Sequence, residues 1–462
     1  MGRKGLTLGV VLMLVLLVSA RASVASAAGP TGTYATGISC VNLGNSTANI
    51  VINFYNTSGS VVGTINDTIS VGGNVLYYTP SRSEIPNNFL GSAVVSSDQP
   101  VACSVNTQTS TGITRVGTSN GVDASKTGTK LFAPQILNNL QGFSSYVAVQ
   151  NAGSASVNVI ARYFNSSGAQ VYSTTVSIPS NSSHVFYQDD GSLPSGFIGS
   201  ATFESADGST PLAGTVNFYN AGTASNNAQF HSYNTFTSGA NKVYGPRVVK
   251  NLSGVGYTSG WSCQNLGPGS ATITATVSFL NQSTNTTVTA ILTKSGLNVG
   301  QAWAVYLGST TGTALDAVSK GYGSVVMESS GGSIACIFNE DNRTTYAGQG
   351  STYSGIPDGS QTTTIFFPQI VALGSSSYQG GFQIANTTST DTICTYAFSN
   401  GTTVNNVPLA GNGSNSVFAP TYVSSFNGSV TVTCGQPIVG IYNLTIFGGA
   451  GDPFATNNGV NK

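Results

Sequence analysis

The chain repeats itself four times, and this internal repeat constrains the fold more than any other feature. Each copy has a Gly-Ser step that opens a strand-like segment, and a second such segment ends on Asn between 15 and 18 residues later. The Gly-Ser steps start at Gly91, Gly199, Gly323 and Gly428, and the asparagines are Asn106, Asn217, Asn339 and Asn443. Upstream of these, each copy has an aromatic residue and a segment that ends on another asparagine, namely Asn42, Asn151, Asn265 or Asn386.

Apolar and polar residues alternate within each copy. The third copy shows this best, because Ile273, Ala275, Val277 and Phe279 are separated by threonine and serine. Such alternation is typical of antiparallel strands with one buried face. Short strands joined by Gly- and Ser-rich turns favour a sandwich over a βαβ unit. We therefore predict an all-β fold of four tandem β-sandwich (Ig-like) domains. The expected boundaries are 1–28 for a cleaved signal peptide, then 29–127, 128–241, 242–360 and 361–462 for repeats one to four.

Copies two to four each begin with a strand-like segment that contains proline. These segments are Phe132–Ile136, Tyr244–Val248 and Phe366–Ile370, and copy one has no counterpart. Proline cannot donate to a sheet ladder, so we expect an edge strand. If this strand belongs to the copy it precedes, the first domain lacks an edge strand and can accept one from another chain. If it instead caps the preceding copy, the fourth domain has the open edge.

The six cysteines fit the repeat. Cys40 and Cys263 share one repeat position, and Cys103 and Cys336 share another, which predicts the disulfides Cys40–Cys103 and Cys263–Cys336. The other copies have Val149 with Gly214 and Ile384 with Gly440 there, a large residue facing a small one, as expected for unbridged core neighbours. Cys394 and Cys434 remain as a third pair. No Cys-x-x-Cys spacing indicates a metal site.

The N-terminus resembles an export signal. Arg3 and Lys4 precede an apolar run from Leu6 to Val18, which is short for a membrane span. Cleavage is expected after 25–27 or, less well, after 20–22; a retained anchor and a prepilin-like cut after Gly5 are the alternatives. No later stretch is long enough to cross a bilayer. We expect an extracellular or cell-surface protein with no transmembrane anchor after signal cleavage.

The charge content excludes some partners. Charged residues make up 6% of the chain, with 15 basic and 15 acidic side chains. No basic track for nucleic acid results from this balance.

Catalytic, metal and cofactor sites are not expected. Of the two histidines, His184 lies in an expected strand with an exposed position, and His231 in a linker-like segment where a solvated side chain is favoured. The segment Gly117–Gly121 matches G-x-S-x-G, but it lacks the strand–elbow–helix context of an activated serine. The adjacent acidic pairs, 189–190 and 340–341, could contribute to a Ca²⁺ site, but turn residues are the favoured interpretation.

Fourteen N-x-[ST] sequons are candidate glycosylation sites, expected in turns that project outward. They are Asn45, Asn56, Asn66, Asn165, Asn181, Asn251, Asn281, Asn285, Asn342, Asn386, Asn400, Asn412, Asn427 and Asn443.

The order of these motifs resembles a known kind of protein. The proline-containing strand, the Asn-terminated strand, the phrase Tyr163–Gly168 and the Gly-Phe-Ile-Gly-Ser of 196–200 resemble tandem β-sandwich repeats in secreted surface proteins of filamentous bacteria such as the Chloroflexota. The composition is similar to that of glycosylated surface-filament subunits of archaea and bacteria. The resemblance implies location and fold, and it transfers no functional residue.

Two functions are therefore expected as alternatives. The first is a non-enzymatic structural subunit of an extracellular filament, sheath or surface layer, which associates with itself or with other surface proteins through open β-edges. The second is an adhesin or glycan-binding module, in which aromatics such as Trp261, Trp303 and Tyr353 stack on sugars, although Trp261 matches Ile38 and is better read as core.

Overall fold

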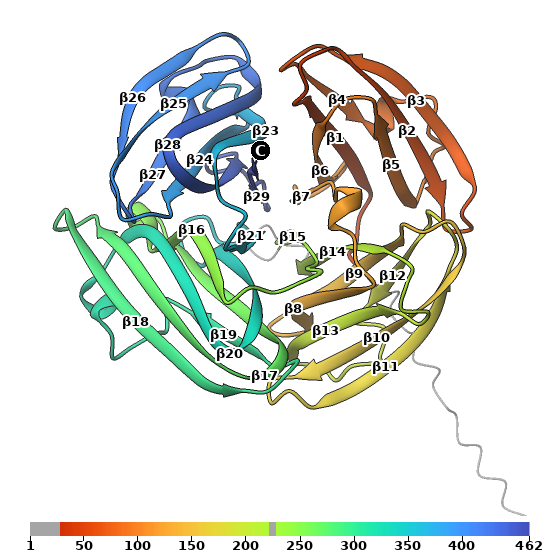
Figure 1. Cartoon of the computed structure of the whole chain (residues 1–462), viewed down its shortest axis with the longest axis horizontal. Helices are drawn as coiled ribbons and strands as arrows, with labels where there is room; N and C mark the ends of the chain where they lie inside the picture. The colour runs from red at the N-terminus through yellow and green to blue at the C-terminus, as the bar shows by residue number, and fades with distance from the viewer. Residues whose placement is uncertain (1–27, 221–227, 462) are drawn as a thin grey trace, which may run out of the picture.

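The computed structural model describes residues 28–220 and 228–461, and these residues form an almost purely β structure. Four units follow one another around a common central axis (Figure 1). In the first two units the strands form two separate antiparallel sheets, whereas in the third and fourth the longest strands run through both sheets. The predicted all-β class with sandwich-like units is confirmed.

The strands fall into the four units in chain order. Unit 1 has β1 (Tyr34–Asn42), β2 (Ala48–Asn56), β3 (Val61–Ile69), β4 (Asn74–Tyr78), β5 (Gly91–Ser97), β6 (Val101–Thr109) and β7 (Val116–Asn120). Unit 2 has β8 (Lys130–Asn138), β9 (Phe143–Asn151), β10 (Val157–Asn165), β11 (Gln170–Ile178), β12 (Ser183–Tyr187), β13 (Phe197–Ser205), β14 (Leu212–Asn220) and β15 (Phe230–Asn234).

The longest strands lie in the later units. Unit 3 has β16 (Lys242–Lys250), β17 (Tyr257–Asn281), β18 (Thr286–Leu297), β19 (Ala302–Tyr306), β20 (Gly321–Asn342), β21 (Gly350–Ser354) and β22 (Ile356–Pro357). Unit 4 has β23 (Thr362–Ala372), β24 (Gln379–Asn386), β25 (Thr392–Phe398), β26 (Thr403–Leu409), β27 (Ser414–Phe418), β28 (Phe426–Thr445), β29 (Ala455–Asn458) and β30 (Val460–Asn461). Short 3₁₀ turns are η1 (Thr79–Ser81), η2 (Ala124–Lys126), η4 (Leu252–Gly254), η5 (Ala314–Ala317) and η6 (Ala419–Thr421).

Unit 2 shows the complete arrangement. Its outer sheet has the strand order β11-β10-β13-β8, and its inner sheet has the order β12-β9-β14-β15. The last strand of each inner sheet, β7, β15, β21 or β29, reaches the central axis (Figure 1). The fold thus places one short central strand from every unit side by side.

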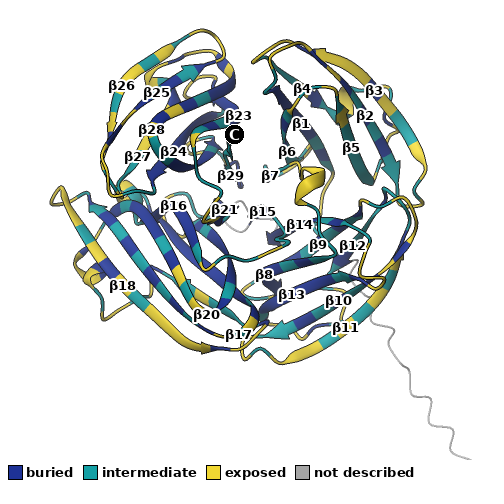
Figure 2. Ribbon diagram, viewed as in Figure 1, coloured by how far each residue is buried: buried dark blue, intermediate teal, exposed yellow. Residues whose placement is uncertain are grey.

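Each unit encloses its own core between its sheets. The alternating residues of β17 behave as predicted, since Ile273, Ala275, Val277 and Phe279 are all fully buried while the threonines between them are partly exposed. Four large apolar clusters result, one for each unit. Figure 2 shows that the buried residues concentrate toward the axis and that the outer surface is exposed.

The recurring asparagine at the end of each inner strand ties down the loop that follows. Asn42 donates through Nδ2 to the carbonyls of Ser46 and Ile69, at 2.7 and 2.9 Å, and accepts from the Gly44 amide at 2.8 Å. Asn151 and Asn265 make the same three bonds in their units. An asparagine suits this place because its amide both donates and accepts.

The cysteines pair as the repeat predicts, in the disulfides Cys40–Cys103, Cys263–Cys336 and Cys394–Cys434. Each bridge joins directly opposed residues of neighbouring antiparallel strands, so it lies within one sheet and does not link the two sheets. In the units without this bridge, Val149 lies opposite Gly214 and Ile384 opposite Gly440.

The proline-containing strands belong to the units they precede, which decides between the two alternatives. β8 pairs with β13, β16 with β20 and β23 with β28, in each case in the same unit's outer sheet, and β16 and β23 also pair for two residues with the short strands β22 and β30. In unit 1 the outer sheet has three strands, in the order β3-β2-β5, and no described strand takes the fourth place. The first unit is therefore the one with the open edge.

A ring of hydrogen bonds joins the central strands at one end. Its members are one residue from each unit, Asn120, Asn234, Ser354 and Asn458. Asn120 and Asn234 exchange backbone–side-chain bonds of 3.0 and 2.8 Å, and Ser354 and Asn458 exchange bonds of 3.0 and 2.6 Å. Bonds from Ser354 Oγ to the Asn234 carbonyl and from Asn120 Nδ2 to the Asn458 carbonyl complete the ring.

At the other end of the central strands, the buried residue Asp452 contacts the three other units. Its Oδ2 accepts from the Phe230 amide and its Oδ1 from the Gly350 amide, both at 2.9 Å. Its backbone exchanges hydrogen bonds with unit 1, donating to the Thr114 carbonyl and accepting from the Val116 amide. Burial raises the pKa of Asp452 well above its ordinary value, and the amide donors and the nearby Arg115 guanidinium oppose this shift.

We expect the substitution Asp452→Asn to destabilise the ring. An amide nitrogen in place of one carboxylate oxygen would face a backbone N–H and leave that donor unsatisfied, at a cost of about 1–3 kcal/mol. The matched change is Asp190→Asn, at an exposed turn where one oxygen accepts from the Ser192 amide; it should stay within about 0.5 kcal/mol. Chemical denaturation followed by circular dichroism measures both, and equal midpoints for the two variants would contradict the role of Asp452.

The expectation that His231 is a solvated linker residue is wrong. It lies on β15 with 6% of its surface exposed, and its Nδ1 is 3.1 Å from Thr352 Oγ1 of unit 3. The segment looked like a linker because the sequence does not reveal that the strand is buried by three other units. Burial lowers the pKa of His231 to about 3.

Acid should therefore destabilise the ring through His231. In the unfolded chain the imidazole has an ordinary pKa near 6.5, so between that value and about 3 the unfolded state binds more protons. The contribution of the neutral imidazole to the free energy of unfolding is fully present above the pKa that His231 has in the unfolded chain. It is lost as pH falls, by roughly 3 kcal/mol between pH 7 and pH 4. Denaturation of His231→Gln at both pH values should show a smaller acid loss than the wild type. His184→Gln, at a partly exposed histidine, should retain most of it.

Candidate functional site

The outer edge of β5 is the one outer-sheet edge in the described structure that lacks its proline strand. The other three outer sheets have β8, β16 or β23 at this place. None of the seven residues of β5 is buried, whereas seven of the nine residues of its counterpart β13 are. In particular, Val95 is partly exposed, while Phe203, Met327 and Val432 at the same repeat position are fully buried. An edge of this kind is a template for pairing with another strand.

A second surface next to this edge is also uncovered. In unit 3 the inner part of β17, residues 257–265, is buried throughout, as are all of β24 in unit 4 and most of β1. On β9 of unit 2, by contrast, Tyr146, Ala148 and Gln150 are partly exposed. These three residues alternate along the strand and share the face that looks toward unit 1. The same missing strand accounts for both surfaces, because a proline strand touches its own outer sheet and the inner strand of the next unit.

The contacts of the other proline strands show what this position normally holds. Each strand changes register at proline, so that the residues at the bulge leave the ladder. At the junction of units 2 and 3, the Pro134 carbonyl accepts from Ser262 Oγ at 2.8 Å and Gln135 Oε1 accepts from Asn339 Nδ2 at 2.8 Å. At the next two junctions, Gln383 donates to the Pro246 carbonyl at 2.7 Å and Asn106 to Gln369 at 2.6 Å. The bulge is thus the connector between adjacent units.

Sequence reasoning left the open edge at either the first or the fourth domain, and it missed the partner surface. Ala148 of β9 holds the repeat position of Ser262 and Gln383, and Asn217 holds that of Asn106 and Asn339. The repeat alignment already places these residues together. What it does not show is that successive units pack on each other as a ring, so that unit 2 faces the gap in unit 1.

The other residues singled out from the sequence do not come together. Ser119 lies in β7 and is buried, so it is not at a nucleophile elbow. Asp189 follows β12 and accepts from the Gly29 amide at 3.2 Å. The pair Glu340 and Asp341 lies within β20 and not in a turn, which corrects that expectation. Within the described ranges, no three His, Cys, Asp or Glu side chains are grouped as a metal site would require.

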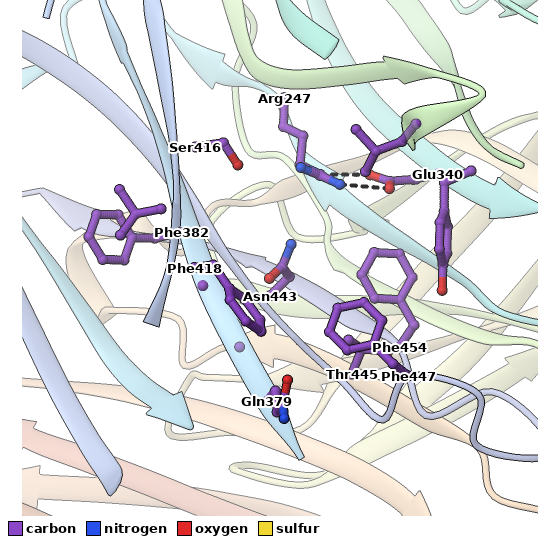
Figure 3. Close-up of a pocket in the computed structure, with 15 residues that line it drawn as sticks. Arg247, Glu340, Gln379, Phe382, Ser416, Phe418, Asn443, Thr445, Phe447 and Phe454 are labelled. Atoms are coloured by element: carbon purple, nitrogen blue, oxygen red, sulfur yellow. Dashed lines mark hydrogen bonds and ion pairs between the residues drawn. The ribbon is translucent and has the colours of Figure 1, made fainter. Parts of the chain in front are cut away.

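A pocket of about 160 Å³ lies between units 3 and 4 (Figure 3). Arg247 and Glu340 form a two-pronged ion pair at one side, with both distances 2.8 Å, and aromatic rings such as Phe418 and Phe454 line the other side. Both charged side chains are more than 90% buried, and each satisfies the other. Ligand pockets usually have volumes of roughly 300 Å³ or more, and this pocket is smaller. Its charges serve to join β16 to β20.

The asparagines of the fourteen sequons differ in how far they are buried. Six asparagines are exposed, namely Asn45, Asn66, Asn285, Asn400, Asn412 and Asn427. Five are partly exposed, namely Asn56, Asn165, Asn181, Asn251 and Asn443. Asn281, Asn342 and Asn386 are buried, which contradicts the expectation that all project outward. Their amides are structural; Asn342 Nδ2, for instance, donates to the Val255 carbonyl at 2.7 Å.

The aromatic residues considered for sugar stacking are mostly in the core. Trp261 and Tyr353 are 1% and 4% exposed, and the partly exposed Trp303 packs edge-on against Trp261 with ring centroids 5.8 Å apart. Tyr353 had been expected on the surface, but its hydroxyl donates to the Arg247 carbonyl inside unit 3. A sugar platform built from these three rings is not available.

Comparisons with known proteins do not place the chain in a family. No protein-family model matches it, and no curated protein is significantly similar in sequence. Among solved structures, it is similar to the Thermotoga maritima protein 1070, with 17% identity over 24% of this chain and 95% of that one and a TM-score of 0.21. It is also similar to the serine-rich repeat protein Srr2 of Streptococcus agalactiae, with 9% identity over 55% of this chain and 86% of that one and a TM-score of 0.12.

The part of the chain that the structure describes contains no helix long and apolar enough to cross a membrane.

Amide hydrogen exchange should distinguish β5 from its counterparts. Backbone N–H groups on an unpaired edge exchange without unfolding, whereas those of β13 require the unit to open. We expect the amides that point away from β2 to exchange on the order of tenfold faster or more than the equivalent amides of β13. Mass spectrometry of peptides that cover Gly91–Ser97 and Phe197–Ser205 measures this. Equal protection of the two strands would mean that β5 is covered.

Proposed function

We propose that this protein is an exported structural component of the cell surface, a subunit of an extracellular filament, sheath or surface layer that assembles through an open β-edge. The unpaired edge of β5 carries the proposal, because the other three units of the same chain close the equivalent edge with a strand. Such an edge is stable in isolation only when it is blunted or paired.

Other features support an extracellular setting and a mechanical role. Three disulfides are typical of proteins that fold in an oxidising compartment. The low charge content means that Ser, Thr, Asn and Gly supply most of the surface polarity, and six exposed sequons could carry sugar. The ring of units ties the first unit to the fourth through Asn106 and Gln369, so a pull on one unit is shared with the others. The alternative of a sugar-binding adhesin loses its support from the aromatic residues, which are mostly in the core.

Blocking the edge should prevent assembly. Val94 lies in the middle of β5 and pairs with Asn53 of β2 on the outward face. Lysine on an edge strand disfavours strand addition, so Val94→Lys should reduce polymers seen by electron microscopy and sedimentation by about tenfold or more. The matched control is Val171→Lys, at an exposed valine of β11, another outer-sheet edge. It should assemble like the wild type.

The proposal fails if the purified exported protein remains monomeric under all conditions, including after mild unfolding and refolding. It also fails if both lysine variants assemble equally well, since the β5 edge would then have no part in the contact.

A further inference from the structure

We propose that the β5 edge and the exposed face of β9 together form a docking site for a single extended segment of another polypeptide, with the pattern apolar–x–apolar–Pro–Gln–apolar. This inference rests on the proposed function and specifies the partner that the edge takes. We call the site the acceptor site; it consists of β5 and of Tyr146, Ala148 and Gln150 on β9.

The apolar positions of the pattern come from the strands that fill this place elsewhere. In β8, Leu131, Ala133 and Ile136 are all at most 1% exposed and belong to the core of unit 2. In β23, Ile365, Phe367 and Ile370 are fully buried in the core of unit 4. In unit 1 the residues that would receive such side chains, Ala93 and Val95, are packed against the core and only partly buried. A segment with these apolar residues would complete that core.

The proline follows from the register. Between the residues opposite Gly199 and Ala201, β8 has two residues, Pro134 and Gln135, where β13 has only Ser200, and the ladder is interrupted there. β23 has the same interruption at Pro368 and Gln369. Proline has no N–H to lose at such a bulge, and it fixes the backbone there. Gly91 of β5 corresponds to Gly199, so the same interruption fits opposite it.

The glutamine follows from the facing unit. Wherever the next unit offers an asparagine that donates to the bulge, the residue after proline is glutamine: Asn339 bonds Gln135 and Asn106 bonds Gln369. Unit 2 offers Asn217, whose Oδ1 accepts from Ser232 Oγ at 2.7 Å, which orients the amide nitrogen away from Ser232. Arginine follows proline only in β16, where Glu340 holds it.

The width of the acceptor site favours one strand over the edge of a folded partner. Unit 1 is held against unit 2 by bonds from Ser92 Oγ to the Asn181 carbonyl at 2.6 Å and from Ser182 Oγ to the Asn56 carbonyl at 3.0 Å. At the filled junctions a single proline strand lies between the outer sheet and the inner sheet of the next unit, so the corresponding place beside β5 and β9 suits one strand. Adjacent strands lie about 4.8 Å apart, whereas a second sandwich is two sheets thick, roughly 10 Å between sheet centres.

The described chain leading into β1 does not occupy the site. The Gly29 amide donates to Asp189, and Gly29 lies beside the ring of Tyr187. Tyr187 is the last residue of β12 in unit 2, and Asp189 follows that strand. The Thr31 carbonyl accepts from Arg115 near the central axis. This path runs past the inner end of the acceptor site and not along β5. The fitting occupant is therefore a segment of a separate chain.

A peptide with the sequence of β8, Lys130–Asn138, tests the proposal as a fluorescent probe. We expect it to bind the full exported chain with one site per molecule, measured by anisotropy, and a scrambled peptide of the same composition to bind at least about tenfold more weakly. Ala148→Arg fills the partly exposed face of β9 and should weaken binding by about a hundredfold. Ala148→Ser recreates the donor that Ser262 supplies to Pro134 and should tighten binding about fivefold. Val171→Arg, on an exposed strand away from the site, should bind like the wild type.

The possible results separate this inference from the proposed function. Peptide binding by a protein that never polymerises would support the acceptor site and overturn self-assembly. Polymers that form normally while the β8 peptide neither binds nor competes would overturn the acceptor site alone. Equal binding of the scrambled peptide, or no effect of Ala148→Arg in a variant with an unchanged melting temperature, would also overturn it.

Discussion

Four short strands meet on one axis, and their backbone groups must find partners without water. This requirement holds the units together. Asp452 supplies acceptors to the amides of Phe230 and Gly350 and exchanges backbone bonds with unit 1, so one buried residue of unit 4 contacts all three of its companions. At the opposite end, Asn120, Asn234, Ser354 and Asn458 form the complementary ring. Each unit leaves polar groups on its innermost strand that only its neighbours satisfy.

Because the units are fixed around the axis, each junction between them has the same geometry. A proline bulge fills three of the four junctions and contacts the inner strand of the next unit. At the fourth junction no described strand fills this place, and bonds from Ser92 and Ser182 connect units 1 and 2 directly. These bonds hold the open edge in position beside unit 2. A preorganised edge of this kind binds a strand at a lower entropic cost than a flexible one.

The repeat made much of this fold predictable. Strand alternation, the pairs Cys40–Cys103 and Cys263–Cys336 and the absence of a first strand in unit 1 follow from aligning the chain with itself. The third cysteine pair follows by elimination, and the structure agrees on the strands and on all three disulfides. His231 was misjudged because a neighbouring unit covers it, with Thr352 of unit 3 beside its ring. Tyr353 and the sequons Asn281, Asn342 and Asn386 were misjudged because contacts inside their own units bury them. The Tyr353 hydroxyl bonds the Arg247 carbonyl, and the three asparagine amides bond carbonyls of nearby loops. The alignment describes each unit alone, so it could not reveal the ring. Nor could it reveal that β5 and the exposed face of β9 lie at the same junction.

The four units are joined in one chain, and this has a consequence for stoichiometry. Four separate copies of one unit would be identical, so their junctions would be all open or all filled. A single chain can omit one strand at one junction only, so each molecule has one acceptor edge among its described outer sheets. Such a molecule has a valence of one at this edge. An array in which each molecule also supplied one strand to the next would extend in a line without branching.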